Sequence, residues 1–214
     1  KYKVDLVDVS NTISMSLGTV DRLKEEGFQV FGPSKEAARI ETDKIWSRNF
    51  MKKYNIPVPK YDTFSDEKLA EEYVKGVYRY NPRKELFIKA AGLCHYQGAI
   101  KADNIEQAYA AIKKIRSLGK PGERFLIEEG LEGEEISITA LCDGEHYSLL
   151  KSANTEKYLR NYDRGPLTRG MGSDSPSLAL KKKSEMMAYI ERAIIRKAIL
   201  GLKREGYPFV GVFT

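Results

Sequence analysis

The first 31 residues follow the order strand, helix, strand, and this order limits the possible folds more than any other feature of the chain. Residues 4–9 form a short apolar run, residues 18–26 have helical spacing, and residues 28–31 form a second run that ends at Gly32 and Pro33. Two strands joined by a helical crossover pair in parallel, which places a helical layer on the sheet. The sequence therefore predicts an α/β fold. The short opening is typical of the last part of a Rossmann-like domain.

Length and hydropathy exclude a membrane protein. The chain has 214 residues, of which 42% are hydrophobic and 31% charged, which suits a folded globular protein. No apolar run approaches the roughly 20 residues that span a bilayer. The charged N-terminal stretch is not typical of a signal peptide. We expect a cytoplasmic location and no membrane partner.

Charge and metal-binding residue types give little support to two further classes, nucleic-acid-binding proteins and zinc proteins. Lysine and arginine total 36 against 30 acidic residues, a net charge of +6, but the cations are mixed with acids and residues 181–183 are typical of a solvated face. We therefore expect no nucleic-acid partner. The pairs Cys94 and Cys142, and His95 and His146, are too few and too scattered for a zinc site, and the cysteines are expected to be free. No metal ligand is predicted within the chain.

The middle of the chain alternates predicted helices and strands. Ser34 is expected to cap a helix that runs to about Tyr54, and a charged helix follows over residues 66–80. Residues 86–90 and 98–101 are expected to form paired strands. The next helix is predicted to begin at Asp103, with Glu106 in capping-box spacing.

The last third of the chain predicts a second sheet. Residues 124–129 form an apolar strand. Asp143 and Gly144 predict a hairpin between residues 135–142 and 145–151. A helix over residues 184–205 and a strand from Pro208 complete the prediction.

The first chemical feature is Lys89, on a predicted strand that leads into a turn bounded by Gly92 and Gly98. A strand lysine beside close-approaching backbone N–H groups can neutralise phosphate oxygens. The simpler alternative is an exposed hairpin. Lys44 lies on the helix after Ser34 and by itself is typical of a surface lysine.

The second feature is an acidic bend within residues 125–137, between two apolar strands. The backbone of such a bend can supply the donor and acceptor that an adenine edge needs, and a later carboxylate can accept from ribose hydroxyls. A solvated acidic turn is the alternative.

The third feature is a glycine-dense loop at residues 165–172, reached through Lys157, Arg160 and Arg164. An ordinary mobile loop is its alternative.

In order along the chain, these segments resemble glycinamide ribonucleotide synthetases of the ATP-grasp superfamily. Residues 31–41 resemble the family's FGPSKEAARLE segment, followed by its helix lysine at Lys44. The phosphate loop falls on residues 89–99, the hinge on residues 127–137 and the substrate loop on residues 165–172. The strand motif P-[FY]-V-G-V matches residues 208–212. The resemblance implies an ATP-grasp fold preceded by the end of a Rossmann-like domain.

The resemblance also implies roles for individual residues. ATP would phosphorylate the carboxylate of glycine, and 5-phosphoribosylamine would displace the phosphate. Lys89 and Lys157 would be catalytic. Residues implied to bind ATP are Lys44, Lys89, Gly92, Gly98, Glu128, Leu131 and Glu135. Residues implied to bind the ribonucleotide substrate are Lys157, Thr168, Gly170, Met171 and Gly172.

Several positions depart from the family pattern. In the phosphate loop the second lysine is Gln97, the aspartate is Ala91, and the small residues are Cys94, His95 and Tyr96. In the substrate loop, Leu167 and Arg169 replace asparagine and glycine. Two alternatives therefore stay open: a paralogue with a different carboxylate and amine, and a nucleotide-binding module without turnover.

The resemblance predicts the domain organisation. Residues 1–55 would end the Rossmann-like domain, residues 56–131 would form the small lid, and residues 132–214 would begin the second ATP-grasp subdomain. The chain is expected to lack both ends of the family's sequence. The Mg²⁺ ligands are expected beyond Thr214. Expected partners are the small molecules glycine and 5-phosphoribosylamine or their analogues, and the protein is expected to be a monomer or dimer.

Overall fold

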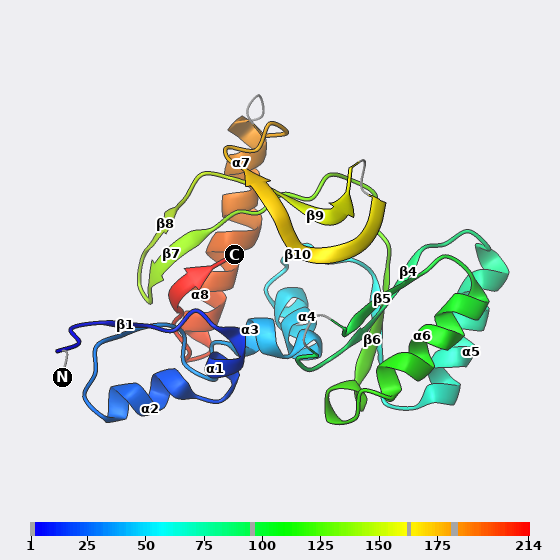
Figure 1. The fold of residues 1–214 in the computed structure, drawn as a ribbon, viewed down its shortest axis with the longest axis horizontal. Coiled ribbons are helices and arrows are strands. Elements are labelled where there is room, and N and C mark those ends of the chain that lie inside the picture. The colour runs from blue at the N-terminus through cyan, green and yellow to red at the C-terminus, as the bar shows by residue number, and fades with distance from the viewer. Residues whose placement is uncertain (1–2, 95–96, 162–163, 181–183) are drawn as a thin grey trace. The chain divides into compact units, whose positions relative to one another are not determined.

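The computed structural model describes residues 3–94, 97–161, 164–180 and 184–214. His95, Tyr96 and the charged run at 181–183 lie outside the described residues. The chain forms two compact units, drawn in Figure 1. Unit 1 comprises Lys1–Ala37 and Gly133–Thr214, and unit 2 comprises Ala38–Glu132. The division into 1–55, 56–131 and 132–214 remains a prediction.

The strand–helix–strand opening of unit 1 is present. β1 (Val7–Asp8) and β2 (Val30–Phe31) pair in parallel, and α2 (Thr19–Glu25) lies between them in the chain. β1 is shorter than the predicted strand at residues 4–9. A further short helix, α1 (Thr12–Ser16), was not predicted; the side chain of Asn11 caps it by accepting from two backbone N–H groups.

The predicted helix from Ser34 to Tyr54 is wrong in its start, although its second half is helical and ends where predicted. The Ser34 hydroxyl accepts from the backbone N–H of Ala37, but the chain then makes only the single turn of α3 (Arg39–Thr42). Asp43 is extended, and its carboxylate accepts from two backbone N–H groups as the N-cap of α4 (Lys44–Lys53). A capping side chain at this position satisfies N–H groups that a continuous helix would have bonded internally, so α4 starts here.

Unit 2 is built on a four-stranded antiparallel sheet in the order β3-β6-β4-β5. Its strands are β3 (Tyr61–Phe64), β6 (Phe125–Glu129), β4 (Leu86–Ala90) and β5 (Ala99–Ala102). β4, β5 and β6 agree with prediction to within one residue, whereas β3 was not predicted.

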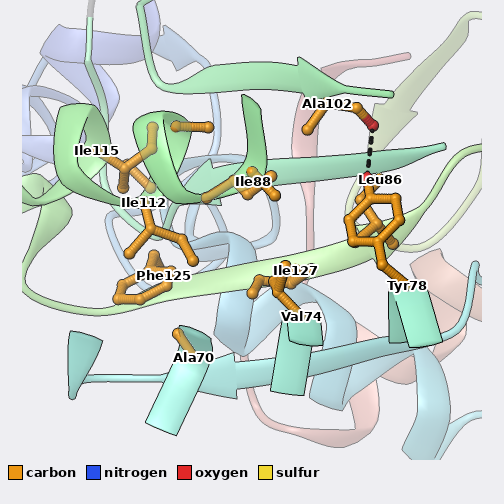
Figure 2. Packing of buried hydrophobic residues seen from close by; sticks show 13 residues of the cluster. Ala70, Val74, Tyr78, Leu86, Ile88, Ala102, Ile112, Ile115, Phe125 and Ile127 are labelled. Atoms are coloured by element: carbon orange, nitrogen blue, oxygen red, sulfur yellow. Dashed lines mark hydrogen bonds between the residues drawn. The ribbon is translucent and has the colours of Figure 1, made fainter. Parts of the chain in front are cut away.

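Two helices, α5 (Glu67–Tyr80) and α6 (Ile105–Arg116), cover one face of this sheet (Figure 1). Figure 2 shows the apolar side chains of both helices packed against those of β4 and β6. In the same core, the Tyr78 hydroxyl donates to the carbonyl of Ala102 at 3.1 Å. The N-cap of α6 is Asn104, not the predicted Asp103: its side chain accepts from the N–H of Gln107. The short 3₁₀ turn η1 (Lys120–Gly122) then leads into β6.

α4 packs on the other face of the sheet. Ile45 of α4, Leu126 of β6 and Ala91 after β4 form a small buried cluster there. Because side chains of a strand alternate between faces, Leu126 and Glu128 lie on the α4 side while Phe125 and Ile127 enter the main core.

The C-terminal part of unit 1 contains the predicted hairpin. β7 (Ala140–Asp143) pairs with β8 (Tyr147–Leu149) across Asp143-Gly144, and β11 (Val210–Phe213) adds on the other side of β7. The predicted helix is present as α7 (Ser184–Ile190), a π turn η2 (Glu191–Ile195) and α8 (Arg196–Arg204). None of the described helices is long and apolar enough to cross a membrane.

The predicted glycine-dense loop is a strand. β10 (Arg164–Asp174) pairs antiparallel with β9 (Asn154–Arg160) in a two-stranded ribbon of unit 1. Its register shifts twice, between Arg164 and Leu167 and between Leu167 and Gly172. Such irregularities let a glycine-rich segment remain paired while it bends.

Candidate functional site

A buried carboxylate lies on the face of the unit 2 sheet that α4 covers, beside the cluster of Ile45, Leu126 and Ala91. The Lys89 ammonium donates to Oε2 of Glu128 at 2.6 Å, and Nε of Arg48 donates to Oε1 of the same carboxylate. Lys89 comes from β4, Glu128 from β6 and Arg48 from α4. Three elements distant in sequence therefore place two cations on one anion.

Burial alone would raise the pKa of the Glu128 carboxyl, because its side chain is only 1% exposed. The hydrogen bonds and positive charges of Arg48 and Lys89 outweigh burial, so the pKa lies below its usual value. Glu128 is therefore ionised at neutral pH.

Lys44 lies at the first position of α4, beside the end of β4. Its backbone N–H donates to the carbonyl of Ala91 at 2.9 Å, and its ammonium donates to the carbonyl of Gly92 at 3.4 Å. Burial lowers the pKa of Lys44; the Cys94 thiol opposes this effect, and the positive charges of Lys89 and Arg48 add to it. A desolvated ammonium next to other cations gains most from an added anion.

Two glycines bound the turn that follows Lys89. A Cβ at Gly92 would lie 3.1 Å from Cα of Pro121, and a Cβ at Gly98 would lie 2.8 Å from Cβ of Cys94. The carbonyl of Gly98 also accepts from the N–H of Ala90 at 2.8 Å. Both ends of the turn therefore rely on the lack of a side chain to bring the backbone close to neighbouring groups.

The acidic bend after β6 is anchored to the rest of unit 2. The N–H of Gly130 donates to the carbonyl of Glu85 at 2.7 Å, and Glu129 forms an ion pair with Lys84 at 2.8 Å. Leu131 follows with 66% of its surface exposed. Since the side chain of Glu128 is held by two cations, a contact from Glu128 to adenine would have to use its main chain.

In unit 1, Lys157 of β9 pairs with Glu135; the Glu135 side chain is 67% exposed and the Lys157 side chain is 39% exposed. Asn154 fixes the segment that carries Glu135: its side-chain amide donates to the carbonyl of Glu135 at 2.9 Å and to Oε1 of Glu134 at 3.0 Å. The two residues predicted as catalytic and ribose-binding groups are thus ion-paired to each other.

The predicted substrate-binding residues follow along β10. The Thr168 hydroxyl donates to the carbonyl of Lys157 at 2.9 Å and accepts from the N–H of Gly170 at 3.0 Å. Gly170 has a φ of 129°, a left-handed conformation that side chains disfavour. Met171 is 59% exposed and Gly172 is paired with Glu156. The strand is therefore open to solvent around Met171.

The predicted residues thus fall into two groups. The first group surrounds the turn after β4 in unit 2 and comprises Lys44, Lys89, Gly92, Gly98 and Glu128. Leu131 lies nearby in sequence, at the end of the acidic bend. Glu135, Lys157 and Thr168 lie together in unit 1, with Gly170, Met171 and Gly172 further along the strand.

Sequence reasoning missed Arg48 and Asn154. Arg48 could have been found, since it lies four residues after Lys44 on one helix and so faces the same side. Asn154 gave no signal, because its partners are 19 and 20 residues away in sequence.

Within the described ranges, no group of three or more histidine, cysteine, aspartate or glutamate side chains is placed to hold a metal ion. The site in unit 2 instead combines Lys44 and Lys89 with a glycine-bounded turn, which suits an anionic ligand.

Comparison with known proteins agrees with the family resemblance seen in the sequence motifs. Residues 42–214 match the family described as phosphoribosylglycinamide synthetase, ATP-grasp (A) domain. The chloroplastic phosphoribosylamine–glycine ligase of Arabidopsis thaliana is 38% identical over 215 residues, 99% of this chain and 39% of that protein. The phosphoribosylamine–glycine ligase of Chlorobaculum tepidum is 34% identical over 214 residues, 99% of this chain and 49% of its own length.

A solved structure points to the same family. The crystal structure of phosphoribosylamine–glycine ligase from Thermotoga maritima superposes with a TM-score of 0.74 at 31% identity, over 86% of this chain and 46% of that one. The chain spans less than half the length of each of these three relatives. Its fold is the mixed α/β ATP-grasp fold, and the chain belongs to the phosphoribosylglycinamide synthetase ATP-grasp domain family.

Proposed function

We propose that this chain is the ATP-binding part of an ATP-dependent ligase that joins glycine to 5-phosphoribosylamine. The observation that carries the proposal is the convergence of Lys44 and Lys89 on a turn bounded by Gly92 and Gly98. The names of the relatives from Arabidopsis thaliana and Chlorobaculum tepidum supply the reaction.

The proposed reaction has two steps. The γ-phosphoryl group of ATP passes to a carboxylate oxygen of glycine, and ADP leaves. The amine nitrogen of 5-phosphoribosylamine then attacks the carbonyl carbon of the acyl phosphate; a C–N bond forms, the C–O bond to phosphate breaks, and phosphate leaves. The protein contributes charge stabilisation and close positioning of the reactants.

In unit 2 we assign Lys44 and Lys89 to the phosphates of ATP. Each offers N–H donors beside backbone that approaches closely, and the charge of each favours the transferring phosphoryl group. The turn from Gly92 to Gly98 would close over the phosphates. The main chain from Glu128 to Leu131 would contact adenine.

In unit 1 we assign Glu135 to the ribose hydroxyls and Lys157 to catalysis. Because these two side chains are paired with each other, a bound nucleotide would compete with Lys157 for the carboxylate of Glu135. The segment of β10 from Thr168 to Gly172 would bind the ribonucleotide substrate.

The reaction implies Mg²⁺, which neutralises charge between the phosphates when it is bound. Neither group of assigned residues provides the cluster of oxygen ligands that Mg²⁺ prefers. We therefore propose none of these residues as a ligand of Mg²⁺.

A second candidate is a paralogue that joins a different carboxylate and amine. It is favoured by Gln97 in place of a phosphate-loop lysine and by Leu167 and Arg169 in the substrate segment. The third reading, a nucleotide-binding module without turnover, predicts ATP binding with no phosphate release. The proposed location is cytoplasmic and the proposed partners are small molecules.

Titration calorimetry with ATP tests the nucleotide site. We expect Lys89→Ala to weaken ATP binding about tenfold or more, since it removes a charge from the phosphates. The matched control is Lys113→Ala, because Lys113 is exposed on α6, which covers the opposite face of the sheet. Equal affinities for the wild type and Lys89→Ala would contradict the assignment.

Phosphate release distinguishes the three candidates, provided that it is measured on a protein that spans the full length of the phosphoribosylamine–glycine ligase relatives. The proposed ligase releases phosphate from ATP only when glycine and 5-phosphoribosylamine are both present. Release with another carboxylate and amine would identify a paralogue. ATP binding without release under any of these conditions would support the non-catalytic module.

A further inference from the structure

Arg48, Lys89 and Glu128 form a charge cluster in unit 2. The proposed function gives no role to Arg48. Arg48 lies one helical turn after Lys44 on α4, so both side chains face the sheet. Nε of its guanidinium donates to Oε1 of Glu128, and Nη1 lies 3.7 Å from the sulfur of Met51. With 19% of its side chain exposed, Arg48 is held in place from two sides.

The charges around Glu128 explain why a second cation is needed. One carboxylate and one ammonium form a neutral pair, and a neutral pair attracts a phosphate weakly. With Arg48 on Oε1 and Lys89 on Oε2, the three groups together keep a net charge of +1. The bond to Glu128 uses one of the three N–H donors of Lys89, and two can point elsewhere.

We propose that Arg48 is a positioning residue for nucleotide binding, which acts by fixing Glu128 and so orienting Lys89 toward the phosphates. The inference rests on the proposed function, since it assumes that Lys89 contacts ATP. Arg48 itself is not assigned a contact with the nucleotide.

Arginine suits this role better than its neighbours do. Its planar guanidinium presents several N–H donors in a fixed geometry, which suits a buried carboxylate. The ammonium of Lys44 instead donates to the carbonyl of Gly92. Among the described residues, removing Arg48 would leave Lys89 as the remaining cation that donates to this almost fully buried carboxylate.

A double-mutant cycle on ATP affinity tests the proposal. The proteins are the wild type, Arg48→Gln, Lys89→Ala and the double variant, with Lys52→Gln, exposed on the same helix, as the matched control. We expect Arg48→Gln to weaken ATP binding about tenfold in the wild type but less than about twofold once Lys89 is alanine, because coupled residues are not additive. Loss of a purely structural residue would weaken both backgrounds equally.

Rescue by a conservative change supplies a second readout. Arg48→Lys keeps the charge and can reach one oxygen, so ATP affinity should return to within about threefold of the wild type. If Arg48→Gln does not fold, this variant still decides: a tenfold or greater loss in a folded Arg48→Lys protein overturns the proposal.

The outcomes distinguish failure of the proposed function from failure of the proposed role of Arg48. No ATP binding by the folded wild type overturns the proposed function and this inference together. Weakened binding in Lys89→Ala with wild-type affinity in Arg48→Gln overturns the role of Arg48 alone. Equal losses from Arg48→Gln in both backgrounds also overturn it.

Discussion

The two faces of the unit 2 sheet use alternate residues of the same strands for opposite purposes. On the face under α5 and α6, the strand residues are apolar and almost fully buried. These residues are Leu86, Ile88, Ala90, Phe125 and Ile127. On the face under α4, the same two strands present Lys89 and Glu128, held with Arg48 in a charge cluster.

The difference shows how a sheet of this size combines stability with a polar site. The apolar face buries area that drives folding, and it does not depend on charge. The polar face must satisfy every buried charge with a partner, since an unpaired one would be costly. A shift of one residue in the pairing register would exchange the two sets of side chains.

The largest expected effect is on the apolar face. Phe125→Ala removes a fully buried ring that stacks on Phe64 with centroids 5.8 Å apart. We expect a loss of about 3–5 kcal/mol in the free energy of unfolding, measured by urea denaturation. Tyr80→Ala is the control, because that ring is 87% exposed and its loss should change little. Similar losses for both variants would refute the contrast between core and surface.

A smaller effect is expected on the polar face, from Glu128→Gln. At neutral pH, replacing the ionised acceptor of two cations should lower the free energy of unfolding by about 1–3 kcal/mol. The folded-state pKa of Glu128 lies below its ordinary value of 4.5, so its stabilising contribution is present above that pH and is lost as pH falls through the folded pKa. The wild type and the variant should therefore converge in acid.

Urea denaturation at several pH values measures this convergence. Glu72→Gln, on the exposed side of α5, serves as the control and should show no comparable difference at neutral pH. A difference between wild type and Glu128→Gln that grows as the pH falls would show that the carboxylate is not stabilised by its cations.

The smallest effect is expected for the exposed ion pair at the edge of the same sheet. Lys101 lies 2.5 Å from Glu85 and 3.3 Å from Asp103, but half of its side chain is exposed. Lys101→Ala should cost about 0–1 kcal/mol because water screens the pair. The difference from wild type should decrease further in about 1 M salt. A loss larger than that of Glu128→Gln would reverse the proposed ranking of buried and exposed pairs.

Elements with their own periodic pattern could be predicted from the sequence. α5, α6, β4 and β6 each carry an apolar pattern that a single stretch of chain reveals. β3 could not be predicted, because Asp62 and Thr63 are polar and exposed; pairing with β6 stabilises the strand. The glycine-rich β10 is likewise stabilised by its partner β9 rather than by its own residues.

Individual residues of the candidate site were predicted from the sequence, but their arrangement was not predicted. Lys44, Lys89 and Glu128 were named from patterns and family resemblance. Their arrangement was not, because Glu128 is 80 residues from Arg48 and 39 from Lys89. The false helix start at Ser34 has a similar origin: the competing cap at Asp43 also forms an ion pair with Arg124, which is 81 residues away.

The π turn η2 in the C-terminal helix has a consequence for how the family sequence can change. A π turn takes up one residue more than an α-turn does, so it corresponds to a single insertion accommodated within an intact helix. Successive residues of a helix are rotated by about 100° about its axis, so the insertion rotates the faces of α7 relative to those of α8. Deleting one residue from Glu191–Ile195 would restore a regular helix but bring different side chains of α7 toward the interior. Any insertion or deletion in this helix would therefore have to restore the phase of its buried residues, which are Ala193, Ile195, Ala198, Ile199, Gly201 and Leu202.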